Sequence, residues 1–393
     1  MDDALLRSAR SLASRLTDLR RDLHRHPELS FQETRTAALA AQALTALGAR
    51  VRSGVGRTGV VADLGPEAGP KVALRADMDA LPLQEVNAVP YASQEPGKMH
   101  ACGHDAHVAC LVGAAALLAA QPLPVGIRCI FQPSEEKEDE QGRSGAQRML
   151  EDGVLEGVAA VLSLHVDGGL DTGRIGVESG FVNAGSDDFT ARILGRGGHG
   201  AHPDQTVDPV WIASQVLAAL YAIPSRRLDP VCRNVLSVGA IHGGEAHNVI
   251  PAQVELGGTL RSFEPDTRTS LRAELERALA LSRVLGGDYE LIVRPGYPAL
   301  HNDPGLCDRV ATAAVALLGP QALGEPRISM GSEDMAYFHQ RVPGAHFRLG
   351  VRRPGGPSRG LHSPTFDLDE EALPIGAAML ARAALEVVRG PNA

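Results

Sequence analysis

The sequence lacks the features of disulfide-stabilised, membrane-spanning and nucleic-acid-binding proteins. Its five cysteines are an odd number scattered over 393 residues, which does not indicate a disulfide framework. No apolar run approaches the roughly 18 to 20 residues needed to cross a bilayer. The net charge is −9, and nucleic acids and anionic membranes attract basic rather than acidic proteins. We therefore expect neither nucleic acid nor membrane as a partner.

A secretory signal is also missing, because the first residues show no basic segment followed by an apolar one. We therefore expect a soluble, cytoplasmic protein whose reduced thiols are available as ligands. The composition, with 44% hydrophobic and 22% charged residues, excludes a disordered or fibrous class. The length suggests about two domains.

The first part of the chain alternates between predicted helices and predicted strands. Apolar periodicity predicts helices at 4–24, 33–47 and 105–120, and strands at 60–64, 71–76, 125–131 and 158–164. Buried strands that alternate with helices are typical of an α/β domain. We expect a mostly parallel sheet that helices cover on both faces.

The pattern changes after about residue 186. Strands are predicted at 189–194, 235–241, 254–261 and 289–294, and helices at 207–222 and 267–285. The order β-α-β-β-α-β is that of a ferredoxin-like α+β domain. We therefore predict an inserted domain at 186–297. The catalytic domain is then discontinuous, at 1–185 and 298–393.

Three of the predicted strands lead directly into residues that bind metals or transfer protons. The first is followed by Asp77 and Asp79, the second by Glu135 and Glu136, and the third by His165. In open α/β sheets, sites form beyond the carboxyl ends of the strands. These side chains are therefore expected to meet.

The stretch from His100 to His107 holds three histidines, a cysteine and an aspartate. Cys102 and His104 are two residues apart, so an extended or turning backbone can point both side chains to one side. Thiolate and imidazole are ligands that zinc accepts. The alternative is a polar loop at the start of a helix, with Asp105 near the N-cap and a thiol that is merely buried.

Glu135 and Glu136 are adjacent like charges at the end of an apolar strand, which is costly unless a cation neutralises them. One of them can bind a metal while its neighbour holds a water molecule. The alternative is a solvated acidic loop, which is our interpretation for Glu138, Asp139 and Glu140.

His165 and His362 are weak signals when each is taken alone. With Cys102, His104 and Glu136, however, they form a set of nitrogen, sulfur and oxygen ligands adequate for two first-row metals, which share and activate one water when about 3.5 to 4 Å apart.

The predicted inserted domain contributes its own candidates. His199 lies in a glycine-rich run, 195–203, that lacks the Lys-Ser/Thr of a phosphate loop, so this histidine is a candidate substrate contact. Asn248 and Arg261 are further candidates, because a guanidinium suits a carboxylate. Taken alone, they would be a turn residue and a surface arginine.

Together these motifs resemble the aminoacylase/hippurate hydrolase-type amidohydrolases, a group that includes indoleacetyl-amino-acid hydrolases. The group belongs to the di-metal aminopeptidase/carboxypeptidase superfamily. The resemblance spans nearly the whole chain and rests on these motifs, in order: Leu23–Leu29, Arg75–Pro82, His100–Asp105, Gln132–Glu136, Gly197–Ala201, Asn248–Pro251, Gly331–Asp334 and Leu361–Pro364.

The resemblance implies a role for each site residue. Glu135 would be the general base and acid, and Asp79 would orient a ligand. His199 would polarise the scissile carbonyl from the partner subunit of a homodimer, and Asn248 and Arg261 would hold the substrate carboxylate or carbonyl. Two divalent ions (zinc, manganese, cobalt or nickel) would be bound by Cys102, His104, Glu136, His165 and His362.

The sequence departs from the family pattern at two places. His202 and Asp204 flank Pro203 where the family usually has Gly-Gly-His-Ala-Ala-Met-Pro-His, and an acidic segment follows Glu136 in place of a glycine-rich loop. The changes beside His199 bear on substrate preference rather than on the reaction. His100, His202 and Asp204 receive no role.

The expected activity is metal-dependent hydrolysis of the amide bond of N-acyl amino acids, small molecules of the N-acetyl, N-benzoyl or aryl-acyl type. The nearest alternative is a dipeptidase or carboxypeptidase. Two further alternatives are a cysteine hydrolase, with Cys102 as nucleophile and His104 as base, and a non-catalytic protein that binds metal or acyl-amino acids.

Overall fold

The computed structural model describes residues 4–389, which form two compact units. The first comprises the chain up to Gly180, His301–Arg327 and the chain from Asp334 onward. The second comprises Phe181–Leu300 and Ile328–Glu333. No helix among the described residues is long and apolar enough to cross a membrane.

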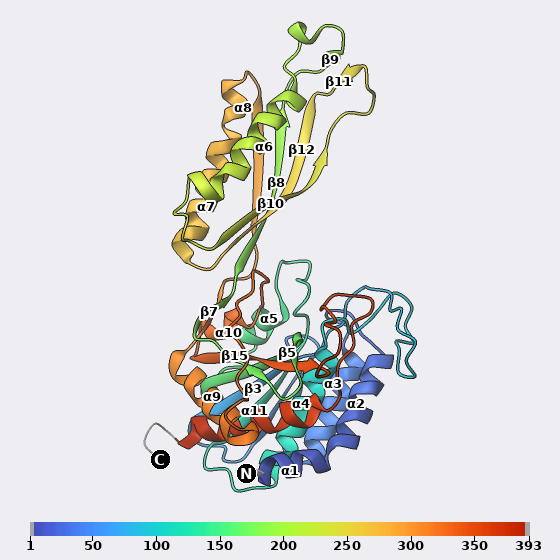
Figure 1. Cartoon of the computed structure of the whole chain (residues 1–393), viewed down its shortest axis with the longest axis vertical. Coiled ribbons are helices and arrows are strands. Elements are labelled where there is room, and N and C mark those ends of the chain that lie inside the picture. The colour runs from blue at the N-terminus through green and yellow to red at the C-terminus, as the bar shows by residue number, and fades with distance from the viewer. Residues whose placement is uncertain (1–3, 390–393) are drawn as a thin grey trace. The chain divides into compact units, whose positions relative to one another are not determined.

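A seven-stranded sheet organises the first unit (Figure 1). Its order is β1-β2-β4-β3-β5-β15-β6, and the four central strands, β4, β3, β5 and β15, are parallel. The outer pairings are antiparallel. The strands are β1 (Arg50–Val55), β2 (Gly59–Leu64), β3 (Lys71–Asp77), β4 (Gly126–Gln132), β5 (Val158–Asp171), β6 (Ile175–Gly176) and β15 (Gly344–Arg352).

Helices cover both faces of this sheet, so the predicted fold class is confirmed (Figure 1). One face packs on α3 (Thr34–Ala46), α4 (His104–Ala119), α9 (Pro304–Leu318) and α11 (Ala372–Arg389), with α1 (Ala4–Ser11) and α2 (Ala13–Arg25) outside them. The other carries the short α5 (Gly145–Glu151) and α10 (Ala336–His339). Helix α4 is buried almost all round, because it lies between the sheet and α2 and α11 and is apolar on every side. Two short strands, β7 (Gly180–Asn183) and β14 (Leu300–Asn302), lie where the chain passes between the units.

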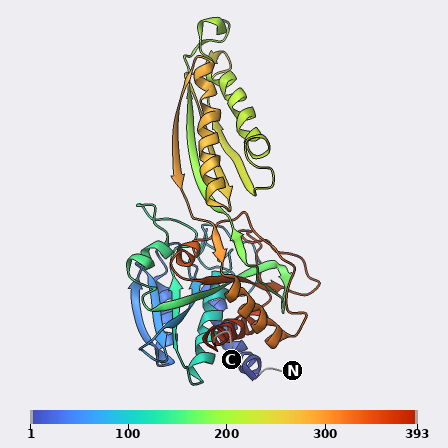
Figure 2. The same cartoon turned by 90° about the vertical axis from the view of Figure 1, so that its left-hand side faces the viewer.

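The second unit is ferredoxin-like, as predicted (Figure 2). Its sheet has the order β10-β12-β8-β13 and packs on α6 and α7. Its elements are β8 (Gly185–Leu194), β9 (Gly198–His199), η1 (Pro203–Gln205), α6 (Pro209–Arg226), β10 (Asn234–His242), β11 (Val249–Ile250), β12 (Gln253–Ser262), α7 (Pro265–Leu279), α8 (Leu281–Val284) and β13 (Asp288–Pro295).

Asp187 of β8 joins this sheet to α7. Its side chain is 0% exposed and accepts hydrogen bonds from Arg268 and Arg272, the latter at 2.6 and 2.7 Å. Burial alone would raise the pKa of Asp187, but the two guanidinium groups outweigh it and lower the pKa below its usual value. The ionised form is therefore the one that stabilises the unit.

We expect Asp187→Asn to lower the free energy of unfolding by about 2 kcal/mol at pH 7, because it removes a charge-assisted pair. A depressed carboxyl pKa stabilises the fold above the unfolded value and is lost as the pH falls, so the difference should shrink below about pH 4. Urea unfolding followed by the fluorescence of Trp211, the chain's single tryptophan and part of α6, measures this unit. The exposed neighbour Asp188 provides the control, Asp188→Asn. Equal effects of the two substitutions would contradict the prediction.

Candidate metal centre

The candidate site lies at the carboxyl ends of the parallel strands β3 and β4. The last residues of the two strands, Asp77 and Gln132, are paired in register. Asp79 and the pair Glu135-Glu136 therefore follow at the same edge of the sheet. The predicted convergence of these carboxylates comes from this register.

His165 reaches the same edge in a different way from the one predicted. The prediction that a strand ends before this residue was wrong, because β5 runs on to Asp171. It continues because β15 pairs with it on one side, with Arg348 opposite His165. On the other side, the pairing of β3 with β5 ends at Ser163. His165 thus lies just beyond the point where β5 loses its β3 neighbour.

Gly103 lets Cys102 and His104 share one side of the chain. It has φ +82°, a left-handed conformation, and α4 begins at the next residue. A Cβ at Gly103 would lie 2.5 Å from Cγ2 of Val166, so only glycine fits there. The Sγ of Cys102 lies 3.4 Å from Nε2 of His165.

The structure brings all five sequence-predicted metal ligands together. Their donor atoms form overlapping groups within which all atoms lie inside 4.8 Å of one another: Cys102–His104–His165, Cys102–Glu136–His362 and His104–Glu135–Glu136. His362 comes from a distant loop, whose backbone is fixed by a 2.9 Å hydrogen bond from its N–H to the carbonyl of Ala101. Its Nε2 lies 3.1 Å from Oε1 of Glu136.

The imidazole of His104 fits a metal ligand. Its Nδ1 lies 3.2 Å from the Asp79 carboxylate, which fixes the proton on that nitrogen. Its Nε2 is buried and makes no hydrogen bond to any residue from 4 to 389. Burial would lower the pKa of His104, but Asp77 and Asp79 outweigh it and raise it to about 10. The same negative surroundings favour a metal cation at Nε2, and the mixed sulfur, nitrogen and oxygen donors suit a divalent first-row metal.

Asp79 contacts both His104 and the turn that carries Glu135 and Glu136. Besides His104, its carboxylate accepts the backbone N–H groups of Glu135, at 3.1 Å, and Glu136, at 3.0 Å. The hydroxyl of Ser30 donates to it at 2.7 Å. One side chain therefore orients an imidazole and the turn that presents the two glutamates.

A second buried network lies behind these residues. Asp77 accepts from Nδ1 of His107 at 2.5 Å, while Nε2 of His107 accepts the N–H of Val166 at 2.9 Å. This pairing requires a neutral imidazole, and burial lowers the pKa of His107 to about 4. Arg75, fully buried, donates to Asp77 at 2.7 Å and to Asp334 at 2.9 Å. The sequence placed His107 only at the helix start or behind the ligands, and Asp334 only within a family motif, because the contacts that define their positions are distant in sequence.

The surroundings of Cys102 do not favour a thiolate nucleophile. Burial, followed by the charges of Glu136 and Glu135, raises the pKa of this thiol well above its ordinary range. Reactive cysteines lie in electropositive surroundings, and these are electronegative. All five cysteines of the chain are free.

The acidic segment after Glu136 is not solvated throughout. Glu140 is exposed, but the prediction was wrong for Asp139, whose side chain is 0% exposed. It lies 2.7 Å from Arg57 and 2.6 Å from Arg148, and it accepts the N–H groups of Gln141 and Arg143. These paired charges fix the loop. His100 is buried as well, and neither of its ring nitrogens makes a hydrogen bond within residues 4–389.

The second unit holds His199 and Asn248 side by side and Arg261 apart from them. Strands β9 and β11 pair His199 with Val249, and the N–H of Gly200 donates to the carbonyl of Asn248 at 2.8 Å. The ring of His202 lies 5.5 Å from that of His199, and Asp204 follows in η1. Arg261 is paired with Ser186 at the other end of β8 and donates to the carbonyl of Met330 at 2.9 Å.

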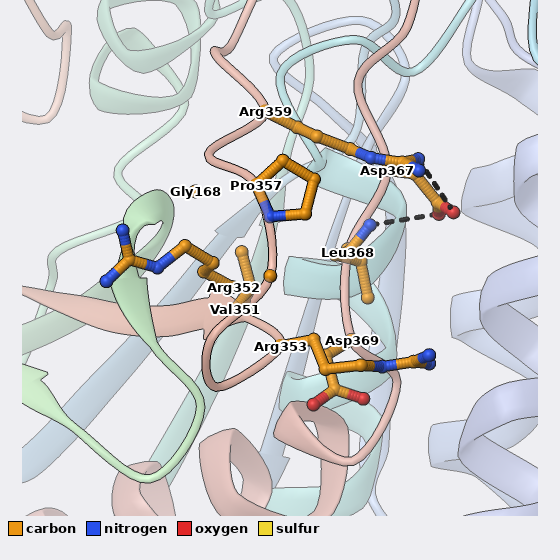
Figure 3. Close-up of a pocket in the computed structure, with 10 residues that line it drawn as sticks. Gly168, Val351, Arg352, Arg353, Pro357, Arg359, Asp367, Leu368 and Asp369 are labelled. Carbon is orange, nitrogen blue, oxygen red and sulfur yellow. Dashed lines mark hydrogen bonds and ion pairs between the residues drawn. The ribbon is translucent and has the colours of Figure 1, made fainter.

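A separate hollow of about 190 Å³ lies beside the loop that leads to His362 (Figure 3). Three arginines line it, but two are paired: Arg352 with Asp171 at 2.6 Å and Arg359 with Asp367 at 3.3 Å. In Figure 3 the arginines point in different directions and do not converge. The hollow therefore lacks the focused charge of an anion site.

The parallel-sheet unit gathers overlapping groups of metal donors beside a further carboxylate, an arrangement that suits a metal-dependent hydrolase. Within that class the chain belongs to Peptidase family M20/M25/M40, whose sequence profile matches residues 73–386. The resemblance found in the motifs is thereby confirmed.

Several relatives are similar over most of their length. An IAA-amino acid hydrolase of Arabidopsis thaliana is 38% identical, over 93% of this chain and 83% of the relative. An N-acetylcysteine deacetylase of Bacillus subtilis is 37% identical, over 95% and 97%. A thermostable carboxypeptidase of Saccharolobus solfataricus is also 37% identical, over 98% of each chain. Among solved structures, a dinuclear metal binding peptidase of the M20 family from Bacillus subtilis has a TM-score of 0.84 and 34% identity, covering 97% of this chain and 99% of that one.

Proposed function

We propose that this protein hydrolyses the amide bond of N-acyl amino acids and releases a carboxylic acid and a free amino acid. The observation that carries the proposal is the position of Glu135: a carboxylate oxygen of this residue lies within 4.8 Å of ligand atoms of both His104 and Glu136. A base beside metal ligands can act on the same water that the metals bind. Relatives named for the hydrolysis of acetyl-cysteine and IAA-amino acid substrates support the substrate class.

In this proposal two divalent ions, zinc, manganese, cobalt or nickel, are held by Cys102, His104, Glu136, His165 and His362. When bound, such ions lower the pKa of water and polarise a carbonyl oxygen. Asp79 keeps His104 in the tautomer that leaves Nε2 available, since Nδ1 faces the carboxylate at 3.2 Å.

Glu135 transfers the proton in both halves of the reaction. Its carboxylate takes a proton from the attacking water, whose oxygen forms a bond to the amide carbon. The carbon–nitrogen bond then breaks as Glu135 returns the proton to the leaving amine. The residue Glu135 is 7% exposed, so little solvent competes for the proton.

The second unit supplies the substrate contacts in this proposal. His199, from the partner subunit of a homodimer, polarises the scissile carbonyl and stabilises the oxyanion. Asn248 lies next to His199 along the β9–β11 pair and serves the same end of the substrate. Arg261, at the opposite end of β8, serves the carboxylate through its planar fork.

A screen of substrates tests the proposal. The apo-protein is incubated with each of the four metals and with N-acetyl, N-benzoyl and indoleacetyl amino acids, and the free amino acid is measured. Hydrolysis of at least one class is expected. Unblocked dipeptides are assayed in parallel, because the thermostable carboxypeptidase is as similar in sequence to this chain as the N-acetylcysteine deacetylase is. Faster cleavage of dipeptides would favour a peptidase. Bound metal without any hydrolysis would favour a binding protein.

A further inference from the structure

Strained backbone gathers around one buried carboxylate, that of Glu33. Four non-glycine residues within 4–389 have positive φ, and three of them lie here: Phe31 at 59°, Arg57 at 80° and Ser134 at 49°. A left-handed conformation costs an L-residue about 1 to 2 kcal/mol. It persists only where the surroundings enforce it, often at functional sites.

Glu33 bonds to two of these strained residues directly. Its Oε1 accepts the N–H groups of both Phe31 and Ser134, each at 2.9 Å. Its Oε2 accepts the hydroxyl of Thr58 at 2.5 Å. The residue is 0% exposed. Two of these donors, Thr58 and Ser134, are distant from Glu33 in the sequence. The third, Phe31, lies two residues before Glu33.

The carboxylate of Glu33 is not needed by its own helix. Glu33 stands at the N-cap of α3 but makes no capping hydrogen bond. The N–H groups of the second and third residues of that helix, Arg35 and Thr36, are capped instead by Glu28, at 2.9 and 2.8 Å. Glu33 is thus left to hold the turn after β4.

That turn determines how the two catalytic-site glutamates point. Side chains of neighbouring strand residues diverge, but β4 ends at Gln132 and Ser134 adopts φ +49°. The following N–H groups, of Glu135 and Glu136, then both face the Asp79 carboxylate. Successive N–H groups turned to one side in this way form an anion-binding concavity.

We propose that Glu33 is a positioning residue: by accepting the N–H of Ser134 it holds Ser134 in the left-handed conformation and so sets the direction of the Glu135 side chain. The inference rests on the proposed role of Glu135 as general base. Glu33 itself touches neither the substrate nor the metal ligands in this role. Its effect should therefore appear in kcat and not in KM.

Two substitutions separate the acceptor oxygen of Glu33 from its charge. Glu33→Leu removes both oxygens, and we expect kcat, measured on fully metal-loaded protein, to fall about a hundredfold, the cost of a misplaced catalytic group, with KM unchanged. Glu33→Gln keeps an oxygen for both N–H groups and offers an amide donor to the Thr58 hydroxyl. Its kcat should stay within about threefold of wild type. Glu33→Met, which is unbranched and closer in length to glutamate, is measured beside the leucine variant in case the latter folds poorly.

A substitution at Ser134 tests the conformation itself. Glycine adopts positive φ without steric cost. The kcat of Glu33→Leu/Ser134→Gly should therefore be about tenfold higher than that of Glu33→Leu. Glu33→Leu/Ser134→Ala also lacks the serine hydroxyl but keeps the steric penalty of a Cβ, and it should regain nothing. Equal recovery in the two double variants, or wild-type kcat in both Glu33→Leu and Glu33→Met, would overturn the proposal.

Hydrogen exchange measures the same contact without a substrate. The amides of Ser134 to Glu136 should exchange faster in Glu33→Leu than in wild type and at the wild-type rate in Glu33→Gln. Unchanged exchange in Glu33→Leu would overturn the positioning role. If wild type hydrolyses nothing in the substrate screen, the proposed function fails, and the exchange rates alone then decide whether Glu33 holds Ser134.

Discussion

Glu135→Gln is expected to lower kcat by about a thousandfold while the protein keeps its metals, because general acid–base catalysis contributes about 10²–10⁴. Glutamine has the same shape as glutamate but cannot take a proton from water at neutral pH. The backbone N–H of residue 135 would still donate to Asp79, as it does at 3.1 Å, so the turn should be retained. The measurement is kcat on the best substrate of the screen, together with metal content per chain.

The matched control for this variant lies five residues away. Glu140→Gln makes the same chemical change in a side chain that is 85% exposed, and its kcat should stay within about twofold of wild type, as usual for surface substitutions. Near-normal turnover in Glu135→Gln would rule out Glu135 as the base. Loss of metal in that variant would instead assign Glu135 to the ligands.

Removal of the metals is expected to lower kcat by about a hundredfold or more, because Lewis-acid catalysis supplies several kcal/mol of transition-state stabilisation. Treatment with a chelator followed by gel filtration should yield an inactive apo-protein. Adding back one of zinc, manganese, cobalt or nickel should restore turnover. Activity and metal content are measured on the same samples.

A thiol reagent separates this mechanism from cysteine catalysis. Cys232 is the only one of the five cysteines that is not buried, so the experiment uses Cys232→Ser as its background. Metal-loaded protein should resist alkylation at Cys102, and the apo-protein should react faster there, because a bound ion would shield the sulfur. Activity that survives the chelator but is lost on alkylation would establish Cys102 as a nucleophile.

Local sequence was sufficient for the class of fold and for the choice of residues that gather at the candidate site. The alternation of helix and strand periods predicted the parallel sheet, and the β-α-β-β-α-β order predicted the ferredoxin-like unit, because both depend on patterns within a few residues. Cys102, Gly103 and His104 lie within three positions, so their shared direction could be predicted as well. The ends of β3 and β4 were also predictable, since polar residues follow apolar runs there.

The structure decided whatever depends on contacts between distant segments. Strand β5 passes His165 because β15, almost two hundred residues later, pairs with it. The side chain of Asp139 is 0% exposed because Arg57 reaches it from another segment. Arg75 binds an aspartate 259 positions away. Glu33 was predicted only as the first residue of a helix, yet its carboxylate bonds to Ser134 because Glu28 already caps that helix. Hydrogen bonds and ion pairs of this kind depend on distances in space, and residue spacing does not encode those distances.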